Sequence, residues 1–258
     1  MSETKNNKFK GVVFDLDGTL LYTLEDILIA MNYALGKNGL TLITLDEVKY
    51  FVGSGARILI VRALKANKAI LNGDVINTQE LEDKVYDAYM EKYKVICADH
   101  ARPYNGIIRT LNILKSLGIK MAVVSNKPQR DTENVIHHYF GDKIFDVVFG
   151  GREGIPLKPA PEAVYQTIKL LGLKKEEVAY VGDSDIDVKT FLNAGLFGIA
   201  VCYGFRTKQE LVAAGATHFA NSPHEIIKYF QDRVDGVLLV DKPEGMTSQA
   251  AVNYVKKN

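Results

Sequence analysis

Cysteine, excess charge and long apolar runs are all scarce in this sequence of 258 residues. Its two cysteines, Cys97 and Cys202, follow no spacing typical of metal or redox sites, so we expect reduced thiols, with a disulfide between them as the alternative. The 32 Lys and Arg residues balance 31 Asp and Glu residues to a formal net charge of +1, which makes a nucleic-acid partner unexpected. Any recognition of an anion must therefore be local.

Signals for export or membrane insertion are also missing. No apolar run approaches the roughly 18 residues of a membrane span, and the first ten residues, MSETKNNKFK, contain no apolar core of a secretion signal. The sequence therefore predicts a cytoplasmic protein with no membrane partner. A chain of this length with 47% hydrophobic residues can bury a sizeable core in one domain or two.

Short apolar runs rich in Val, Ile and Phe alternate with longer segments of helical periodicity, which predicts an α/β fold with a parallel sheet covered on both faces. The expected strands are residues 11–15, 119–126, 145–149, 178–183 and 198–203. The expected helices are residues 107–117, 129–139, 161–171, 186–194 and 208–214.

After the first strand, the strand signals stop, and amphipathic helices such as 24–38 and 79–96 follow. Because the core pattern resumes at Tyr104, we expect a core domain of residues 1–21 and 104–232 with an inserted helical cap of residues 22–103. Two connections to the cap would permit a hinge. Residues 233–258 then form a C-terminal extension.

The strongest chemical signal is FDLDGTL, residues 14–20, directly after the first strand. Ligands of open α/β sheets bind at the carboxyl ends of the strands, where Asp15 and Asp17 are expected. Asp15 suits a nucleophile that attacks phosphorus, and Asp17 suits the acid that protonates the departing oxygen and then the base that activates water. The alternative interpretation is an ordinary acidic turn.

Two further segments offer ligands for a phosphate group. Ser125 and Asn126 end the next core strand, where a hydroxyl and backbone N–H groups can hold phosphate oxygens, although a turn or helix cap is the commoner role of such a pair. Lys158 lies in LKPAP, residues 157–161, ahead of a helix, and could offset the charge of the nucleophile and phosphate. An isolated Lys is usually a solvated surface residue.

A fourth segment, YVGDSDID at residues 180–187, again follows a strand. Asp183 can complete an oxygen-rich Mg²⁺ site with Asp15 and the main-chain carbonyl of Asp17. Asp187 could orient the lysine or a metal-bound water, and Asp185 is expected to face solvent or cap the helix.

At these four segments, in this order, the sequence resembles the haloacid dehalogenase superfamily, most closely its phosphoglycolate phosphatase branch, over about residues 9–232. The resemblance implies a Rossmann-like core, Mg²⁺, and these roles: nucleophile Asp15, acid and base Asp17, phosphate ligands Ser125 and Lys158, metal ligand Asp183. The second aspartate argues against a dehalogenase. The chain departs from the branch at Leu21-Tyr22-Thr23, where the first connection to the expected cap lies.

The expected cap contains FVGSGAR, residues 51–57, which resembles the substrate-specificity loop of the branch. Two glycines let the backbone approach a ligand, and Arg57 could bind a substrate carboxylate with two hydrogen bonds. A turn between helices with a surface arginine is an equal alternative.

The C-terminal extension resembles the opening of TruB-family tRNA pseudouridine synthases from Asp235 to Ser248, without that family's catalytic aspartate motif. We expect a fused or read-through fragment there, or otherwise an extra strand or a disordered tail.

The sequence as a whole predicts a Mg²⁺-dependent phosphatase that acts on a small phosphomonoester, with 2-phosphoglycolate as the best single substrate, through an aspartyl-phosphate intermediate. The alternatives are a sugar-phosphate mutase, a pyrophosphatase and a catalytically inactive interaction module. The sequence leaves a monomer or a homodimer open.

Overall fold

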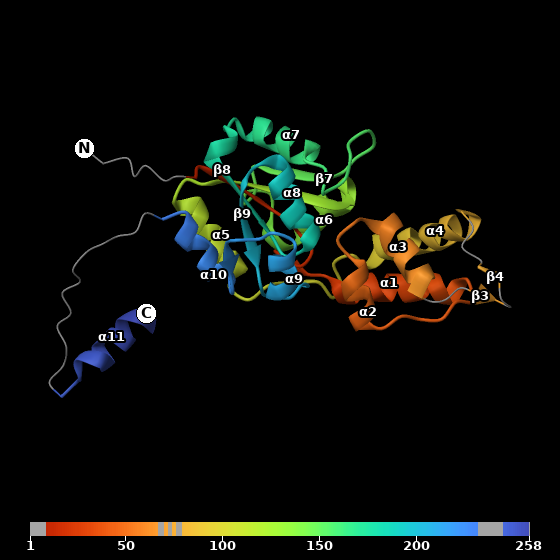
Figure 1. The fold of residues 1–258 in the computed structure, drawn as a ribbon, viewed down its shortest axis with the longest axis horizontal. Helices are drawn as coiled ribbons and strands as arrows, with labels where there is room; N and C mark the ends of the chain where they lie inside the picture. The colour runs from red at the N-terminus through yellow and green to blue at the C-terminus, as the bar shows by residue number, and fades with distance from the viewer. Residues whose placement is uncertain (1–8, 67–69, 72–73, 76–78, 232–244, 258) are drawn as a thin grey trace.

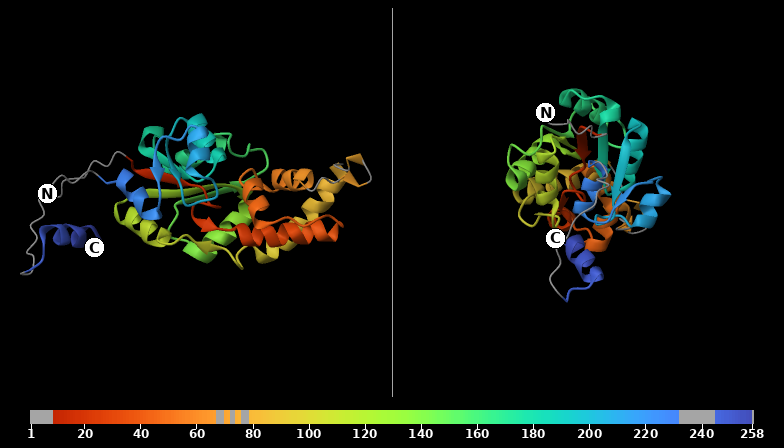
Figure 2. Two further views of the ribbon diagram at one scale, coloured as in Figure 1. Left: turned by 60° about the horizontal axis from the view of Figure 1, so that its bottom comes forward. Right: turned by 90° about the vertical axis from the view of Figure 1, so that its left-hand side faces the viewer.

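The computed structural model describes residues 9–66, 70–71, 74–75, 79–231 and 245–257. Figure 1 shows two parts, an α/β core and a group of helices at one end of it. Figure 2 shows the same two parts end to end, with helices on both sides of the core sheet.

Six parallel strands form the core sheet, in the order β10, β9, β8, β1, β6, β7. Their bounds are β1 Gly11–Phe14, β6 Lys120–Pro128, β7 Val147–Gly151, β8 Val178–Gly182, β9 Phe197–Val201 and β10 Phe219–Ala220. The predicted α/β fold is therefore confirmed, and each end of the five predicted strands lies within two residues of its expected position. The strand β10 was missed because two residues are too few to show a period.

Alternate residues of the central strand enter different apolar clusters, as strand geometry requires. Val12 and Phe14 belong to the cluster on one face, and Val13 belongs to the cluster on the other. The first face is covered by α5 Ile107–Ser116, α6 Gln129–Phe140 and α10 Pro223–Ile226. The second is covered by α7 Glu162–Leu171, α8 Asp185–Ala194 and α9 Lys208–Ala213. Burial on both faces explains why these strands read as continuous apolar runs.

The helices at the end of the core form the cap, with bounds α1 Leu24–Lys37, α2 Leu45–Phe51, α3 Ala56–Ala66 and α4 Gln79–Ile96. The helical insert also contains a short antiparallel pair that the sequence did not indicate, between β3 Ile70–Leu71 and β4 Asp74–Val75. The domain boundaries at residues 21–22 and 103–104 stay a prediction.

The two connections to the cap are tied together in the structure. The strand β2, Leu21–Tyr22, pairs antiparallel with β5, Arg102–Pro103. The fully buried Asp26 carboxylate on α1 accepts hydrogen bonds from the main-chain N–H groups of His100 and Ala101, each at 2.9 Å. A carboxylate bound by two N–H groups is a strong link, so the cap and its second connection are held at one point.

Only part of the expected C-terminal extension falls within the described residues. These contain the helix α11, Ser248–Lys257, which Figure 1 shows apart from the core. The stretch that resembles pseudouridine synthases, residues 235–248, lies outside the described residues except for its last four.

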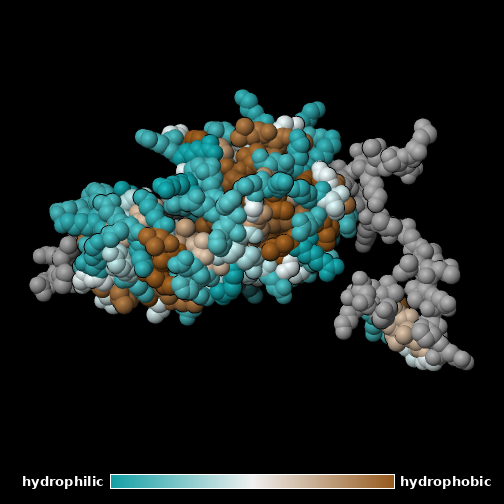
Figure 3. All heavy atoms as spheres, turned by 180° about the vertical axis from the view of Figure 1, so that it is seen from behind, coloured by the Kyte–Doolittle hydropathy of each residue, from teal (hydrophilic) through white to brown (hydrophobic). Residues whose placement is uncertain are grey.

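The surface mixes hydrophilic residues with apolar ones, as Figure 3 shows from behind. Large apolar side chains that are exposed, such as Leu42 in the cap and Leu170 on α7, are ordinary on a protein surface. In the part of the chain that the structure describes, no helix is both long enough and apolar enough to cross a membrane.

Candidate active site

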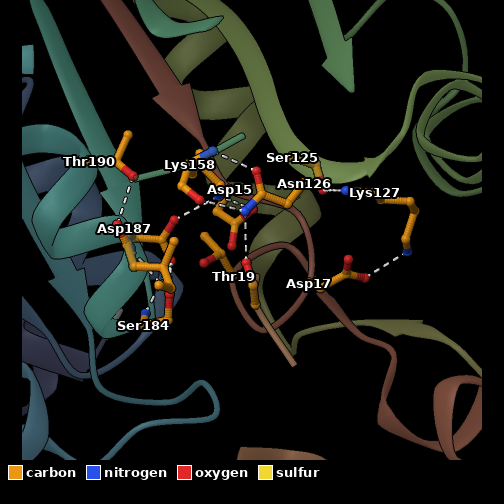
Figure 4. A network of polar contacts seen from close by, with 12 residues as sticks. Asp15, Asp17, Thr19, Ser125, Asn126, Lys127, Lys158, Ser184, Asp187 and Thr190 are labelled. Atoms are coloured by element: carbon orange, nitrogen blue, oxygen red, sulfur yellow. Dashed lines mark hydrogen bonds and ion pairs between the residues drawn. The ribbon is translucent and has the colours of Figure 1, made fainter. Parts of the chain in front are cut away.

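The predicted chemical residues meet at one edge of the sheet because the strands that carry them are neighbours. The strand β1 lies between β6 and β8, and all three run parallel. Asp15 follows β1, Ser125 lies near the end of β6, and Asp183 follows β8. Figure 4 shows Asp15 and the polar side chains of β6 together with Lys158 and Asp187 in a network of polar contacts.

Lys158 is the centre of this network. Its ammonium lies 2.6 Å from Asp15 Oδ1 and 2.8 Å from Asp187 Oδ1, and its side chain is only 2% exposed. Burial disfavours the charged ammonium, but the carboxylates of Asp15 and Asp187 outweigh this effect and hold the pKa of Lys158 well above its ordinary value. Lys158 is therefore a permanent positive charge beside Asp15.

Asp187 is held by the first turn of α8. Its Oδ2 accepts hydrogen bonds from the hydroxyl and the main-chain N–H of Ser184, at 2.6 and 3.1 Å, and its Oδ1 accepts one from the Tyr180 hydroxyl at 2.9 Å. Burial opposes its charge, but the positive charge of Lys158 lowers the pKa of Asp187. Asp187 is thus an ionised carboxylate that fixes the position of Lys158.

Three buried carboxyl groups, those of Asp15, Asp183 and Asp187, bring oxygen atoms within 4.8 Å of one another. Asp183 accepts hydrogen bonds from the Thr19 hydroxyl at 3.0 Å and the Phe205 main-chain N–H at 2.7 Å. Burial and the charge of Asp187 raise the pKa of Asp183 to about 7. The pKa of Asp15 is raised as well, mainly by burial and next by the negative charge of Asp187.

Raised pKa values show that the positive charge near these acids does not offset their burial. A hard divalent cation with oxygen ligands fits this shortage of charge. Asp15 and Asp183 are the better ligands, because their pKa values are raised, whereas the charge of Lys158 already lowers the pKa of Asp187.

Two glycines let the loops approach the Asp183 carboxyl closely. Gly18 has a φ of 89°, and a Cβ there would lie 2.3 Å from Asp183 Oδ2. A Cβ on Gly204 would lie 2.3 Å from Asp183 Cβ. The glycine in the first motif is therefore needed both for its backbone conformation and for space.

The side chain of Asn126 is committed to the protein. Its Nδ2 donates to the main-chain oxygens of Gly53, at 2.9 Å, and Lys158, at 3.0 Å. Its Oδ1 accepts from the Lys158 N–H at 2.8 Å. The side-chain amide of Asn126 thus joins β6 to the lysine loop and to the cap, and the role of this residue in binding phosphate stays a prediction.

Arg57, which was expected to bind a substrate carboxylate, is paired within the cap in the structure. It stands on the first turn of α3 and forms an ion pair with Asp83 of α4, with its guanidinium 4.0 Å from the centre of the Tyr86 ring. The Arg57 side chain is 56% exposed. The glycines of its loop do line the site, but the helix turns Arg57 away toward α4.

Lys127 is a site residue that the sequence reasoning missed. Its Nζ lies 2.7 Å from Asp17 Oδ1, and its side chain is 5% exposed. Burial opposes the charge of Lys127, yet the Asp17 carboxylate outweighs it and raises the pKa of Lys127. The available signal was its position directly after Ser125 and Asn126, which the sequence had already placed in the site.

A cavity of about 60 Å³ lies between the core and the cap. From the core it is lined by Asp15, Asp17, Ser125, Asn126, Lys127 and Pro128, and from the cap by Ile27, Val52, Gly53, Gly55, Ala56, Leu59, Tyr89, Met90 and Tyr93. A cavity that holds a single water molecule has a volume of about 10–15 Å³, so this cavity has room for a ligand of few atoms.

Arg206, also missed from the sequence, joins the core to the cap loop. Its guanidinium donates to the main-chain oxygens of Lys49 at 2.6 Å, Tyr50 at 3.2 Å and Val52 at 3.4 Å. The last main-chain carbonyls of a helix such as α2 have no hydrogen-bond partners within the helix, and the Arg206 guanidinium supplies donors for them.

Comparisons with known proteins agree with this geometry. A family model described as haloacid dehalogenase-like hydrolase matches residues 12–201. The phosphoglycolate phosphatase of Haemophilus influenzae is 33% identical over 200 residues, which cover 78% of this chain and 88% of that protein. The phosphoglycolate phosphatase of Pseudomonas syringae pv. tomato is 27% identical over 248 residues, covering 96% and 89%. Among solved structures, a predicted phosphoglycolate phosphatase from Haemophilus somnus has a TM-score of 0.80 and 26% identity, covering 88% of this chain and 100% of that one.

Proposed function

Because this chain belongs to the haloacid dehalogenase-like hydrolase family, we propose that it is a Mg²⁺-dependent phosphatase of a small phosphomonoester, with 2-phosphoglycolate as its substrate. The observation that carries the proposal is the environment of Asp15, a buried carboxylate with a lysine on one side and a second acid, Asp183, on the other. The relatives named phosphoglycolate phosphatase support the choice of substrate.

In the first step, a carboxylate oxygen of Asp15 attacks phosphorus while the bond from phosphorus to the ester oxygen breaks. Lys158 holds Oδ1 of Asp15, which leaves the other oxygen to form the new bond. Its charge offsets the repulsion between the carboxylate and the phosphate. Ser125 and the main chain of Asn126 would hold the oxygens that are not transferred.

Asp17 gives its proton to the departing ester oxygen, so that an alcohol leaves rather than an alkoxide. In the second step Asp17 takes a proton from the attacking water, the bond between phosphorus and Asp15 breaks, and inorganic phosphate forms. Asp15 and Asp17 return to their starting states, so the cycle balances.

The residues that would hold Mg²⁺ are Asp15, Asp183 and the main-chain carbonyl of Asp17. When bound, the cation would offset the charge that builds up between Asp15 and the phosphate. The two acids with raised pKa values are the ones that this arrangement would neutralise.

The small cavity supports a small leaving group. About 60 Å³ between core and cap has room for a ligand of few atoms, as 2-phosphoglycolate is. A sugar-phosphate mutase must also hold a sugar, and no observation in the described residues favours it or a pyrophosphatase.

The test is hydrolysis of 2-phosphoglycolate by wild type and by Asp15→Asn, with Mg²⁺, followed by release of inorganic phosphate. We expect Asp15→Asn to lose turnover and keep its circular dichroism spectrum. Asp142→Asn, whose side chain is 77% exposed in the wild type, is the matched control and should keep full activity. A folded Asp15→Asn protein with substantial activity would rule out the nucleophile.

A further inference from the structure

Lys127 supplies the positive charge in the wall of the cavity. The charged side chains among the described lining residues are Asp15, Asp17 and Lys127. Asp15 and Asp17 serve the proposed chemistry, whereas the proposed steps give Lys127 no role. The ion pair with Asp17 offsets the cost of burying this ammonium, and the side chain still lines the substrate cavity.

Tyr93, on α4 of the cap, stands beside this lysine. Lys127 Nζ lies 5.5 Å from the centre of the Tyr93 ring, and the ring is stacked on Tyr89 at 5.3 Å. Tyr93 is 2% exposed, and its hydroxyl has no hydrogen-bond partner among the described residues. A buried hydroxyl without a partner is unfavourable, so an acceptor brought by a ligand would satisfy it.

The position of Asp17 shows which part of a substrate would reach these two residues. Asp17 is proposed to protonate the ester oxygen, so that oxygen lies beside its carboxyl group. Lys127 Nζ is 2.7 Å from the same carboxyl group. A substituent one or two bonds beyond the ester oxygen therefore comes within reach of Lys127, and in 2-phosphoglycolate that substituent is the carboxylate.

We propose that Lys127 and Tyr93 form the subsite that binds the carboxylate of the leaving group, in the place that the sequence had assigned to Arg57. The inference rests on the proposed function and names the residues that select its substrate. Lys127 donates a charge-assisted hydrogen bond to the carboxylate, and the Tyr93 hydroxyl donates a second one.

The ion pair between Lys127 and Asp17 places this recognition beside the chemistry. Lys127 Nζ lies 2.7 Å from Asp17 Oδ1, so a carboxylate bound by Lys127 is held next to the residue that acts on the ester oxygen.

The experiment measures kcat/KM for 2-phosphoglycolate and for ethyl phosphate, which has a similar size and no carboxylate. We expect Lys127→Met to lower the ratio of the two values by about 10-fold to 100-fold, and Tyr93→Phe by about 3-fold to 10-fold. Lys127→Met also lowers kcat on both esters, because Asp17 loses its partner. The ratio isolates the contact to the carboxylate.

Matched controls lie at exposed positions. Lys94→Met, next to Tyr93 on α4, and Tyr33→Phe on α1 should leave the ratio unchanged. Calorimetry with 2-phosphoglycolate and the Asp15→Asn protein gives a second measurement that needs no turnover. Adding Lys127→Met to that protein should weaken binding about 10-fold or more, and Lys127→Arg should restore part of the loss.

Equal losses on both esters, or unchanged binding in the Asp15→Asn background, would overturn the subsite and leave Lys127 as a positioning residue for Asp17. A wild type that hydrolyses both esters equally well would also overturn it, with the phosphatase activity intact. A wild type that hydrolyses neither ester with Mg²⁺ would refute the proposed function itself.

Discussion

Removal of divalent cations should make the stability of the protein depend on pH near neutrality, through Asp183. Burial and the charge of Asp187 raise the pKa of the Asp183 carboxyl from its ordinary value of 3.8 to about 7 in the fold. The folded state therefore binds the proton more tightly than the unfolded state does. Stability is gained at low pH and is lost as the pH rises through 7.

The size of the effect follows from these two pKa values. Proton binding by Asp183 stabilises the fold by about 1 kcal/mol at pH 6 and by almost nothing at pH 8. For a chain of this size that difference lowers the melting temperature by about 2 to 4 °C between pH 6 and pH 8. The raised pKa of Asp15 acts in the same direction. The lowered pKa of Asp187 has no effect here, because its carboxyl is ionised throughout this range.

The assay is thermal unfolding in EDTA at pH 6, 7 and 8, repeated with excess Mg²⁺. The cation should raise the melting temperature most at pH 8, because at pH 6 it must displace a proton. Asp183→Asn should lose both the pH effect and the Mg²⁺ effect, whereas the exposed Asp142→Asn should keep them. An Asp183→Asn protein with the pH profile of the wild type would show that another group is responsible.

Four further outcomes are expected. EDTA should abolish hydrolysis and Mg²⁺ should restore it, with Ca²⁺ a poor substitute because its larger and looser shell misplaces the nucleophile; full activity in chelator would contradict the site. Asp17→Asn should still bind substrate, measured by calorimetry, and turn over at least about 100-fold more slowly. Arg206→Ala should speed hydrogen exchange in the cap loop at residues 49–53 and raise KM, because three main-chain carbonyls lose their donor. Arg57→Ala should change KM for neither 2-phosphoglycolate nor ethyl phosphate, because the partner of Arg57 is Asp83. Unchanged exchange in Arg206→Ala would remove its role as a link to the cap.

Much of the architecture could be predicted because it depends on local properties of the chain. An apolar run buried on both faces, such as Val12 to Phe14, identifies a strand without knowledge of its neighbours. Polar residues directly after such a run then lie at the carboxyl edge of a parallel sheet. Asp15, Ser125 and Asp183 were found in this way, and the structure places them on adjacent strands, directly after β1, within β6 and directly after β8.

The sequence by itself thus determined the fold class, the order of the motifs and the edge of the sheet at which they meet. Only the tertiary structure decided which side chains face the substrate cavity. Lys127 meets an acid 110 residues away, and Arg206 meets carbonyls more than 150 residues away. Arg57 turns instead toward a neighbouring cap helix. The direction of each of these side chains depends on which helices and strands pack together and on the rotamers that this packing allows. Neither produces a periodic pattern or a motif in the sequence.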